Sequence, residues 1–307
     1  MMYAIIEFHA GDYGLFPSQS LETLDCYQNG CLNAVSIMPN SPYLSECMEM
    51  LQPYQKDIKT AIHLNFMEGR SVCAPEQVSL LTNGDGIFDT SFGKLLLAGI
   101  LPNRKEYQRQ LRREIHAQIH AVTPFLDPSR PLRIDGHAHY HMLPVVFDSL
   151  IQVLEDEKLN VEYIRIPRER LPIYLKARKA LEGIKLINLV KVMILNLLAI
   201  RNRQKHREYL EHMEDKLFLG VALSGNMTRK NVDAILPGAL RETEKTGQGI
   251  EILAHPGGVY DPAETAQLTH PDDKKFLTDD LRKREKEMFC TLKNRWVHQK
   301  ESEQKNE

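Results

Sequence analysis

Residues 131–144 read PLRIDGHAHYHMLP, a short extended stretch that ends in side chains able to bind a metal or move a proton. Three other stretches end in the same way: YAIIEFHAGD at residues 3–12, DIKTAIHL at 57–64 and GIEILAHPGG at 249–258. The carboxyl ends of parallel strands open onto one shared crevice, where α/β proteins build their active sites. These stretches therefore predict an α/β fold with titratable side chains gathered at one edge.

The rest of the chain alternates between strand-like and helix-like segments. Further strands are expected at residues 31–40, 161–167 and 217–225, and helices at 18–29, 41–55, 102–122 and 144–158. Strands separated by helices pair in parallel through right-handed crossovers. Seven such strands without a linker predict a single-domain, distorted (β/α) TIM-like barrel. We assign residues 1–297 to this domain and 298–307 to a disordered C-terminal tail, with the loop 69–92 and the charged helix 273–297 as additions.

The composition is that of an ordinary globular chain, with 307 residues of which 42% are hydrophobic and 26% charged. The net charge of −2 gives no electrostatic reason to expect nucleic acid or an anionic membrane as a partner. Five irregularly spaced cysteines and the lack of a leader-like segment predict reduced thiols in a cytoplasmic protein. The apolar run 186–200 is shorter than the ~20 residues of a spanning helix, so we expect a core helix there.

The segment RIDGHAHYH at residues 133–141 carries the strongest local signal. In an extended chain the side-chain period of two places Asp135, His137, His139 and His141 on one face. Four such groups do not suit an apolar core, so this pattern favours metal binding or catalysis. The alternative interpretation is a solvated edge strand whose histidines have no function.

Four residues at other strand ends are candidates for the same site. Asp12 lies between Gly11 and Gly14, where the chain turns sharply, and the alternative is a simple Asx-turn. His63 and His255 end their strands, and either could instead be structural. Arg165 could anchor an acid or a substrate oxygen, or form a surface salt bridge. One carboxylate with two imidazoles leaves positions open for water, as hydrolytic metal sites require.

With these residues in place, the chain resembles the YdjC/ChbG-like carbohydrate deacetylase family from about residue 3 to residue 297. The similar segments are HAGDYG at residues 9–14, AIHLNF at 61–66, DGHAHYH at 135–141 and EILAHP at 251–256. The resemblance implies a barrel-like fold in which Asp12, His63 and His137 bind a divalent metal. The resemblance favours Mg²⁺, whereas two histidines and one aspartate suit Zn²⁺ and other first-row ions. It also implies that His255 faces the substrate, where it can donate a proton to the departing amine.

One departure from the family pattern affects catalysis. The first Asp of the family's Asp-Asp pair, the expected general base, is Gly11 here. Strand alternation would place His9 on the face opposite Asp12, so Asp135 or His139 is the expected substitute. General-base catalysis is worth about 10² to 10⁴ in rate, so its loss could leave a slow enzyme or a binding protein.

We therefore expect a metal-dependent hydrolase that removes the acetyl group from an N-acetylated sugar or oligosaccharide, with Arg165 as a substrate-binding residue. The alternative within the family is an inactive or weakened protein that binds sugar or metal. A third interpretation, a phosphoesterase or amidohydrolase, fits less well because those folds carry their His-x-His motif on the first strand. The expected partner is a small sugar, and a homodimer is compatible with the sequence.

Overall fold

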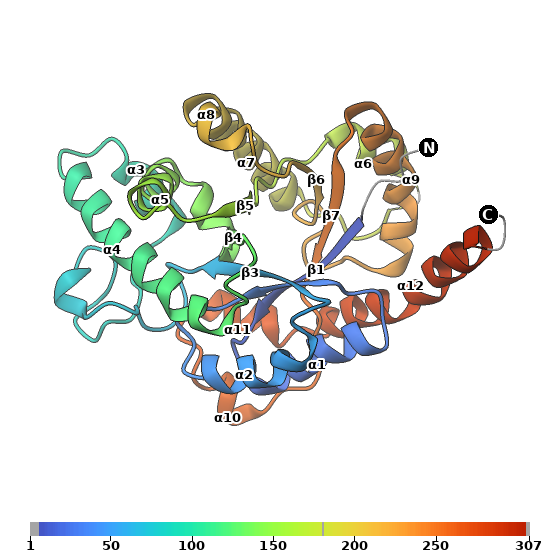
Figure 1. The fold of residues 1–307 in the computed structure, drawn as a ribbon, viewed down its shortest axis with the longest axis horizontal. Helices are drawn as coiled ribbons and strands as arrows, with labels where there is room; N and C mark the ends of the chain where they lie inside the picture. The colour runs from blue at the N-terminus through green and yellow to red at the C-terminus, as the bar shows by residue number, and fades with distance from the viewer. Residues whose placement is uncertain (1–5, 180, 305–307) are drawn as a thin grey trace.

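The computed structural model describes residues 6–179 and 181–304, and its centre is one sheet of parallel strands (Figure 1). All seven predicted strands are present. They are β1 (Ile6–Tyr13), β2 (Ala34–Ile37), β3 (Lys59–Leu64), β4 (Leu132–Gly136), β5 (Val161–Ile164), β6 (Lys216–Leu219) and β7 (Gly249–Ala254). Their order in the sheet is β5-β4-β3-β2-β1-β7-β6, and every neighbouring pair is parallel.

The sheet curls into a half-barrel that stays open on one side. Among the described residues no ladder joins β5 to β6, the two strands at its edges. Helices surround the outer face of the sheet (Figure 1), which confirms the prediction of a single-domain, distorted TIM-like barrel.

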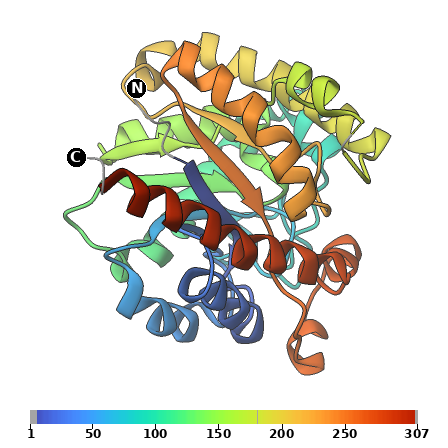
Figure 2. The same ribbon diagram turned by 90° about the vertical axis from the view of Figure 1, so that its right-hand side faces the viewer.

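Helices lie close to the ranges predicted at 18–29, 41–55, 102–122 and 144–158, and the described residues form further helices as well. They are α1 (Pro17–Gln28), α2 (Leu44–Leu51), α3 (Phe92–Ala98), α4 (Arg104–Val122), α5 (Pro144–Asp156), α6 (Leu171–Ala177), α7 (Leu186–Lys205), α8 (Arg207–Leu210), α9 (Arg229–Thr246), α10 (Pro262–Thr265), α11 (Pro271–Leu277) and α12 (Leu281–Gln304). The single helix expected at 273–297 is two helices, α11 and α12. Helix α12 packs against α1 and α9 (Figure 2) and runs through Gln304, past the predicted start of the tail, while residues 305–307 lie outside the described residues.

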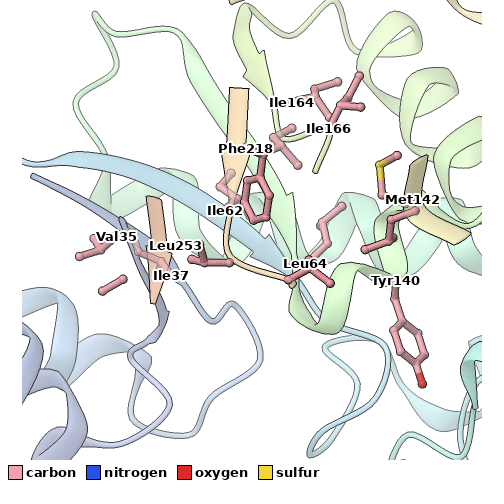
Figure 3. Packing of buried hydrophobic residues seen from close by; sticks show 14 of the residues in the cluster. Val35, Ile37, Ile62, Leu64, Tyr140, Met142, Ile164, Ile166, Phe218 and Leu253 are labelled. Atoms are coloured by element: carbon pink, nitrogen blue, oxygen red, sulfur yellow. The ribbon is translucent and has the colours of Figure 1, made fainter. Parts of the chain in front are cut away.

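Both faces of the sheet are buried, but one face is apolar and the other is polar. Val35 and Ile37 of β2 and Ile62 and Leu64 of β3 point to the apolar layer between sheet and helices (Figure 3). Ser36 alternates with its neighbours on β2 and points the other way, into the half-barrel, where it meets polar side chains. The outer layer therefore holds the fold together, and the interior is free to carry charged groups.

The histidine-rich segment is not the regular strand that was predicted. Strand β4 ends at Gly136, opposite the end of β3 at Leu64, and residues His137–Met142 form a tight turn of 3-10 type. Ala138 and His139 have positive φ values of 46° and 60°. Because the neighbouring strand gives no further ladder partner, the chain turns here instead of keeping the period of two.

Helix α7 is not the core helix that the apolar run predicted. Val192 and Leu195 are buried, but Leu186, Met193 and Leu197 are 78%, 58% and 67% exposed. One side of this helix packs on the domain and the other carries apolar side chains outward. None of the helices in the described ranges combines the length and the apolar composition that a membrane-spanning helix requires.

Candidate metal and catalytic site

Asp12, near the end of β1, points its carboxylate at two histidines from other segments of the sheet. Its Oδ1 lies 3.2 Å from Nε2 of His63, on β3, and 2.8 Å from Nδ1 of His137, just after β4. All three side chains are buried. The structure thus brings together the three predicted metal ligands, which are up to 125 residues apart in the sequence.

A backbone irregularity in β1 turns Asp12 into the half-barrel. The ladder between β1 and β2 is irregular between Ala10 and Tyr13, and Asp12 has a φ of 63°, a region that Asp tolerates better than most residues. His9 also points inward, with Nε2 2.7 Å from Oγ of Ser36. The expectation that His9 lies on the face opposite Asp12 is therefore wrong, because the irregularity breaks the alternation.

Each histidine uses its second ring nitrogen to contact another carboxylate. Nδ1 of His63 lies 2.6 Å from Oδ1 of Asp135, and Nε2 of His137 lies 3.0 Å from Oδ2 of Asp273. In metal sites such a carboxylate fixes the tautomer and the orientation of the ring and makes the imidazole a better ligand. In both rings, the nitrogen left for a cation is the one that faces Asp12.

The charges around these rings favour a bound cation. Burial alone would lower the pKa of His137, but Asp273 and Asp12 outweigh it and hold this pKa well above its usual value. Burial would raise the pKa of Asp12, but His137 and His63 hold it well below its usual value. The raised pKa of His137 reflects the two carboxylates beside it, which stabilise positive charge, whereas the lowered pKa of Asp12 keeps its carboxylate anionic and able to bind a cation.

The donor set fits a divalent metal ion. Potential ligand atoms of Asp12, His63 and His137 lie within 4.8 Å of one another. One carboxylate and two imidazoles suit Zn²⁺ and other first-row ions, and such a set leaves coordination positions for water and substrate.

His255 fills the space where a side chain at position 11 would be. A Cβ atom built on Gly11 would lie 2.6 Å from both Cδ2 and Nε2 of the His255 ring, far inside normal contact distance. The same Nε2 is 3.8 Å from Oδ2 of Asp12. The imidazole therefore occupies the position beside Asp12 at which the resemblance implied a carboxylate.

Helix α12 and helix α11 hold His255 in this position. Its backbone N–H donates to Oε2 of Glu285 at 2.7 Å, and Arg282 donates to the same oxygen at 2.9 Å. Its ring meets Phe276 edge-on, with 5.1 Å between the ring centroids. Burial, despite the nearby Asp12, lowers the pKa of His255 to about 3, so its ring is neutral near pH 7.

Arg165 does not lie at a surface that a substrate could reach. Its side chain is 0% exposed, and its guanidinium lies 2.5 Å from Oδ2 of Asp135 and 2.5 Å from Oε1 of Glu251. Tyr163 also donates its hydroxyl to Glu251. The structure places Arg165 beneath the site, where it supports the carboxylate that contacts His63.

The network of charged side chains continues deeper into the half-barrel. Nδ1 of His9 lies 3.1 Å from both Glu251 and Glu7. Glu7 is paired with three cations, Arg133 at 2.9 Å, Lys216 at 2.6 Å and Lys59 at 3.3 Å. Protein cations thus already neutralise the carboxylates in the group of Glu7, His9 and Glu251. This second buried group is therefore a structural network, not a metal site.

The two expected substitutes for the general base lie in different surroundings. Asp135 is fully buried, with Oδ1 on His63 and Oδ2 shared by Ser36 and Arg165. Burial would raise the pKa of Asp135, but the positive charges of Arg165 and His63 hold this pKa far below its usual value. His139 is half-buried, and its Nδ1 is buried without a hydrogen-bond partner among the described residues.

Sequence reasoning missed Asp273 and the residues that position it. Asp273 lies in α11, and Glu68, five residues after His63, holds the turn before that helix. Glu68 accepts hydrogen bonds from Thr269 and His270 at 2.8 to 2.9 Å. No local sequence pattern predicts the contact between Glu68 and His270, because it joins segments that are about two hundred residues apart.

Residues 5–297 match a protein-family model described as YdjC-like protein. The chain belongs to the YdjC-like family. This YdjC-like protein is 28% identical over 296 residues to a carbohydrate deacetylase from Xenopus laevis, covering 92% of this chain and 91% of that protein. It is 23% identical over 164 residues to a chitooligosaccharide deacetylase from Yersinia pestis (strain Pestoides F), covering 53% of this chain and 61% of that protein.

A solved structure supports the fold of the YdjC-like protein. It is a crystal structure from Enterococcus faecalis V583, whose name proposes cellobiose-phosphate cleavage. It superposes with a TM-score of 0.60 at 15% sequence identity and covers 94% of this chain and 95% of that chain. At this identity, the likeness concerns the fold alone.

Proposed function

We propose that this YdjC-like protein is a metal-dependent carbohydrate deacetylase that hydrolyses the acetamide of an N-acetylated sugar or oligosaccharide. The observation that carries the proposal is the convergence of Asp12, His63 and His137. Oδ1 of Asp12 lies 3.2 Å from Nε2 of His63 and 2.8 Å from Nδ1 of His137. The names of the related deacetylases support the substrate class.

In this proposal Asp12, His63 and His137 hold the cation. A divalent cation supplies Lewis acidity, which lowers the pKa of a water molecule and polarises a carbonyl group. Asp135 and Asp273 keep the two rings turned so that the nitrogens nearer Asp12 stay available. Two imidazoles among three ligands favour Zn²⁺ or a similar ion, whereas Mg²⁺ prefers oxygen ligands.

His255 is the proposed proton carrier. Its Nε2 lies beside Asp12 in the space of the missing carboxylate, so it can take a proton from the attacking water and deliver it to the departing amine. Asp135 is assigned a positioning role instead of a role as base, because both of its oxygens are already engaged. His139, with a buried and unpartnered Nδ1, is the second candidate for the base.

The alternative is a family member that binds sugar or metal without efficient catalysis. Gly11 favours it, because no carboxylate can lie there while the His255 ring fills the space. Acetate release distinguishes the deacetylase from the binding protein. Acetate release from N,N′-diacetylchitobiose is measured for the metal-free chain and after addition of Zn²⁺ or Mg²⁺. Metal-dependent acetate release supports the enzyme, whereas metal binding without acetate supports the binding protein.

A substitution at Asp273 tests the support of His137. Asp273→Asn is expected to weaken metal binding about 10- to 100-fold, because a neutral amide holds the imidazole less firmly than a carboxylate does. The dissociation constant is measured by equilibrium dialysis. The exposed neighbour Asp272 provides the control, since Asp272→Asn makes the same charge change away from His137. Equal affinities in the two variants would contradict the assignment.

A further inference from the structure

A second cluster of metal-binding side chains lies outside the half-barrel, between α4 and the end of α5. His116 and His120 are one helical turn apart on α4, and Glu157 follows the last residue of α5. Residues at i and i+4 share one face of a helix, and the two ring centroids are 4.3 Å apart. Potential ligand atoms of the three side chains lie within 4.8 Å of one another.

The carboxylate already aligns the two rings. Nδ1 of His116 lies 2.6 Å from Oε1 of Glu157, and Nε2 of His120 lies 2.6 Å from Oε2. One nitrogen of each ring thus faces the same carboxylate. The imidazoles are 55% and 49% exposed, so an ion can enter from solvent without any movement of the backbone.

This cluster differs from the buried group around Glu7, which resembles it in composition. There, arginine and lysine side chains neutralise the carboxylates. In the described part of the chain, the ion-pair partners of Glu157 are the two imidazoles alone. No built-in cation competes for its oxygens. A surface ion pair by itself contributes little to stability, so it gives little reason for the three groups to converge.

We propose that His116, His120 and Glu157 form a second divalent-metal site, which takes Zn²⁺ or a similar first-row ion. Two imidazole nitrogens and one carboxylate oxygen supply three ligands, and water from the open side completes the coordination. The ion joins α4 to the end of α5, two helices that pack on each other. The site is independent of the proposed deacetylase activity, because none of its residues belongs to the half-barrel.

The test uses the full chain with the substitution His137→Ala, which weakens the barrel site. Zinc binding is measured by equilibrium dialysis for this parent and for the parent with His116→Ala and His120→Ala. Loss of about one zinc per chain in the second protein is the expected result. The matched control adds His212→Ala, another exposed histidine beside a glutamate, and is expected to bind as much zinc as the parent.

Two further measurements make the outcome decisive. Zinc is expected to raise the thermal unfolding midpoint of the parent but not that of the protein without the histidine pair, since an ion bound only by the folded chain stabilises it. Glu157→Gln in the parent is expected to weaken zinc binding about tenfold or more, because it removes the anionic ligand. Equal zinc binding with and without His116 and His120, or no effect of Glu157→Gln, would overturn the three-residue site.

Discussion

Asp12→Asn is expected to remove most divalent-metal binding from the half-barrel and to reduce acetate release to near the uncatalysed level. Asp12 is the anionic member of the ligand set, and both histidines face its Oδ1. Lewis-acid catalysis contributes several kcal/mol, so we expect a loss of roughly 10³-fold or more in kcat/KM. Asparagine is the suitable replacement because it keeps the size of the side chain and tolerates the φ of 63°.

Metal affinity and kcat/KM are measured on the same preparations of this variant. Exposed Asp57 supplies the control, because Asp57→Asn removes the same charge away from the site. Unfolding by urea checks that the variant remains folded. If Asp12→Asn binds metal in the half-barrel as tightly as the unmodified chain does, then the proposed ligand set is wrong.

His255→Gln is expected to lower kcat by about 10² to 10⁴ while leaving metal affinity within a few-fold of the starting value. Glutamine can still form hydrogen bonds beside Asp12, but it cannot carry a proton. The ring of His255 is 3.8 Å from Asp12, farther than either ligand ring, so its loss should spare the metal. Steady-state acetate release and equilibrium dialysis separate the two effects.

His139→Gln is the matched comparison for this prediction. A large loss of kcat in His139→Gln with little loss in His255→Gln would reverse the assignment of the proton carrier.

A second experiment uses the space at position 11. In His255→Ala the added Cβ of Gly11→Asp no longer meets a ring, so the double variant is expected to recover part of the lost kcat. In the unmodified chain, Gly11→Asp alone must displace the ring and should not raise kcat.

The sequence predicted the framework well because its signals are local. Short extended segments separated by helices predicted the seven parallel strands, and the titratable residues at the strand ends predicted the convergence of Asp12 with His63 and His137. Strand topology alone carries such residues to one edge of a sheet. No knowledge of side-chain packing was needed for this part of the site.

The errors arose where tertiary contacts override a local pattern. The side-chain period of two predicts an extended chain through His141. Strand β4 instead ends at Gly136, where its ladder with the neighbouring strand β3 also ends. Arg165 lies at a strand end like the other candidate residues, yet two buried carboxylates hold it beneath the site. The apolar composition of α7 predicted burial, but composition does not reveal that only one side of a helix has a partner.

The contact between Asp273 and His137 makes the two ends of the chain interdependent. All three proposed ligands lie in the first half of the sequence, but α11, near the other end, restrains one of their rings. A fragment that stops before α11 would keep every ligand and lose this restraint. Sequence matches confined to the first half of the chain therefore compare the ligands without comparing the scaffold that orients them.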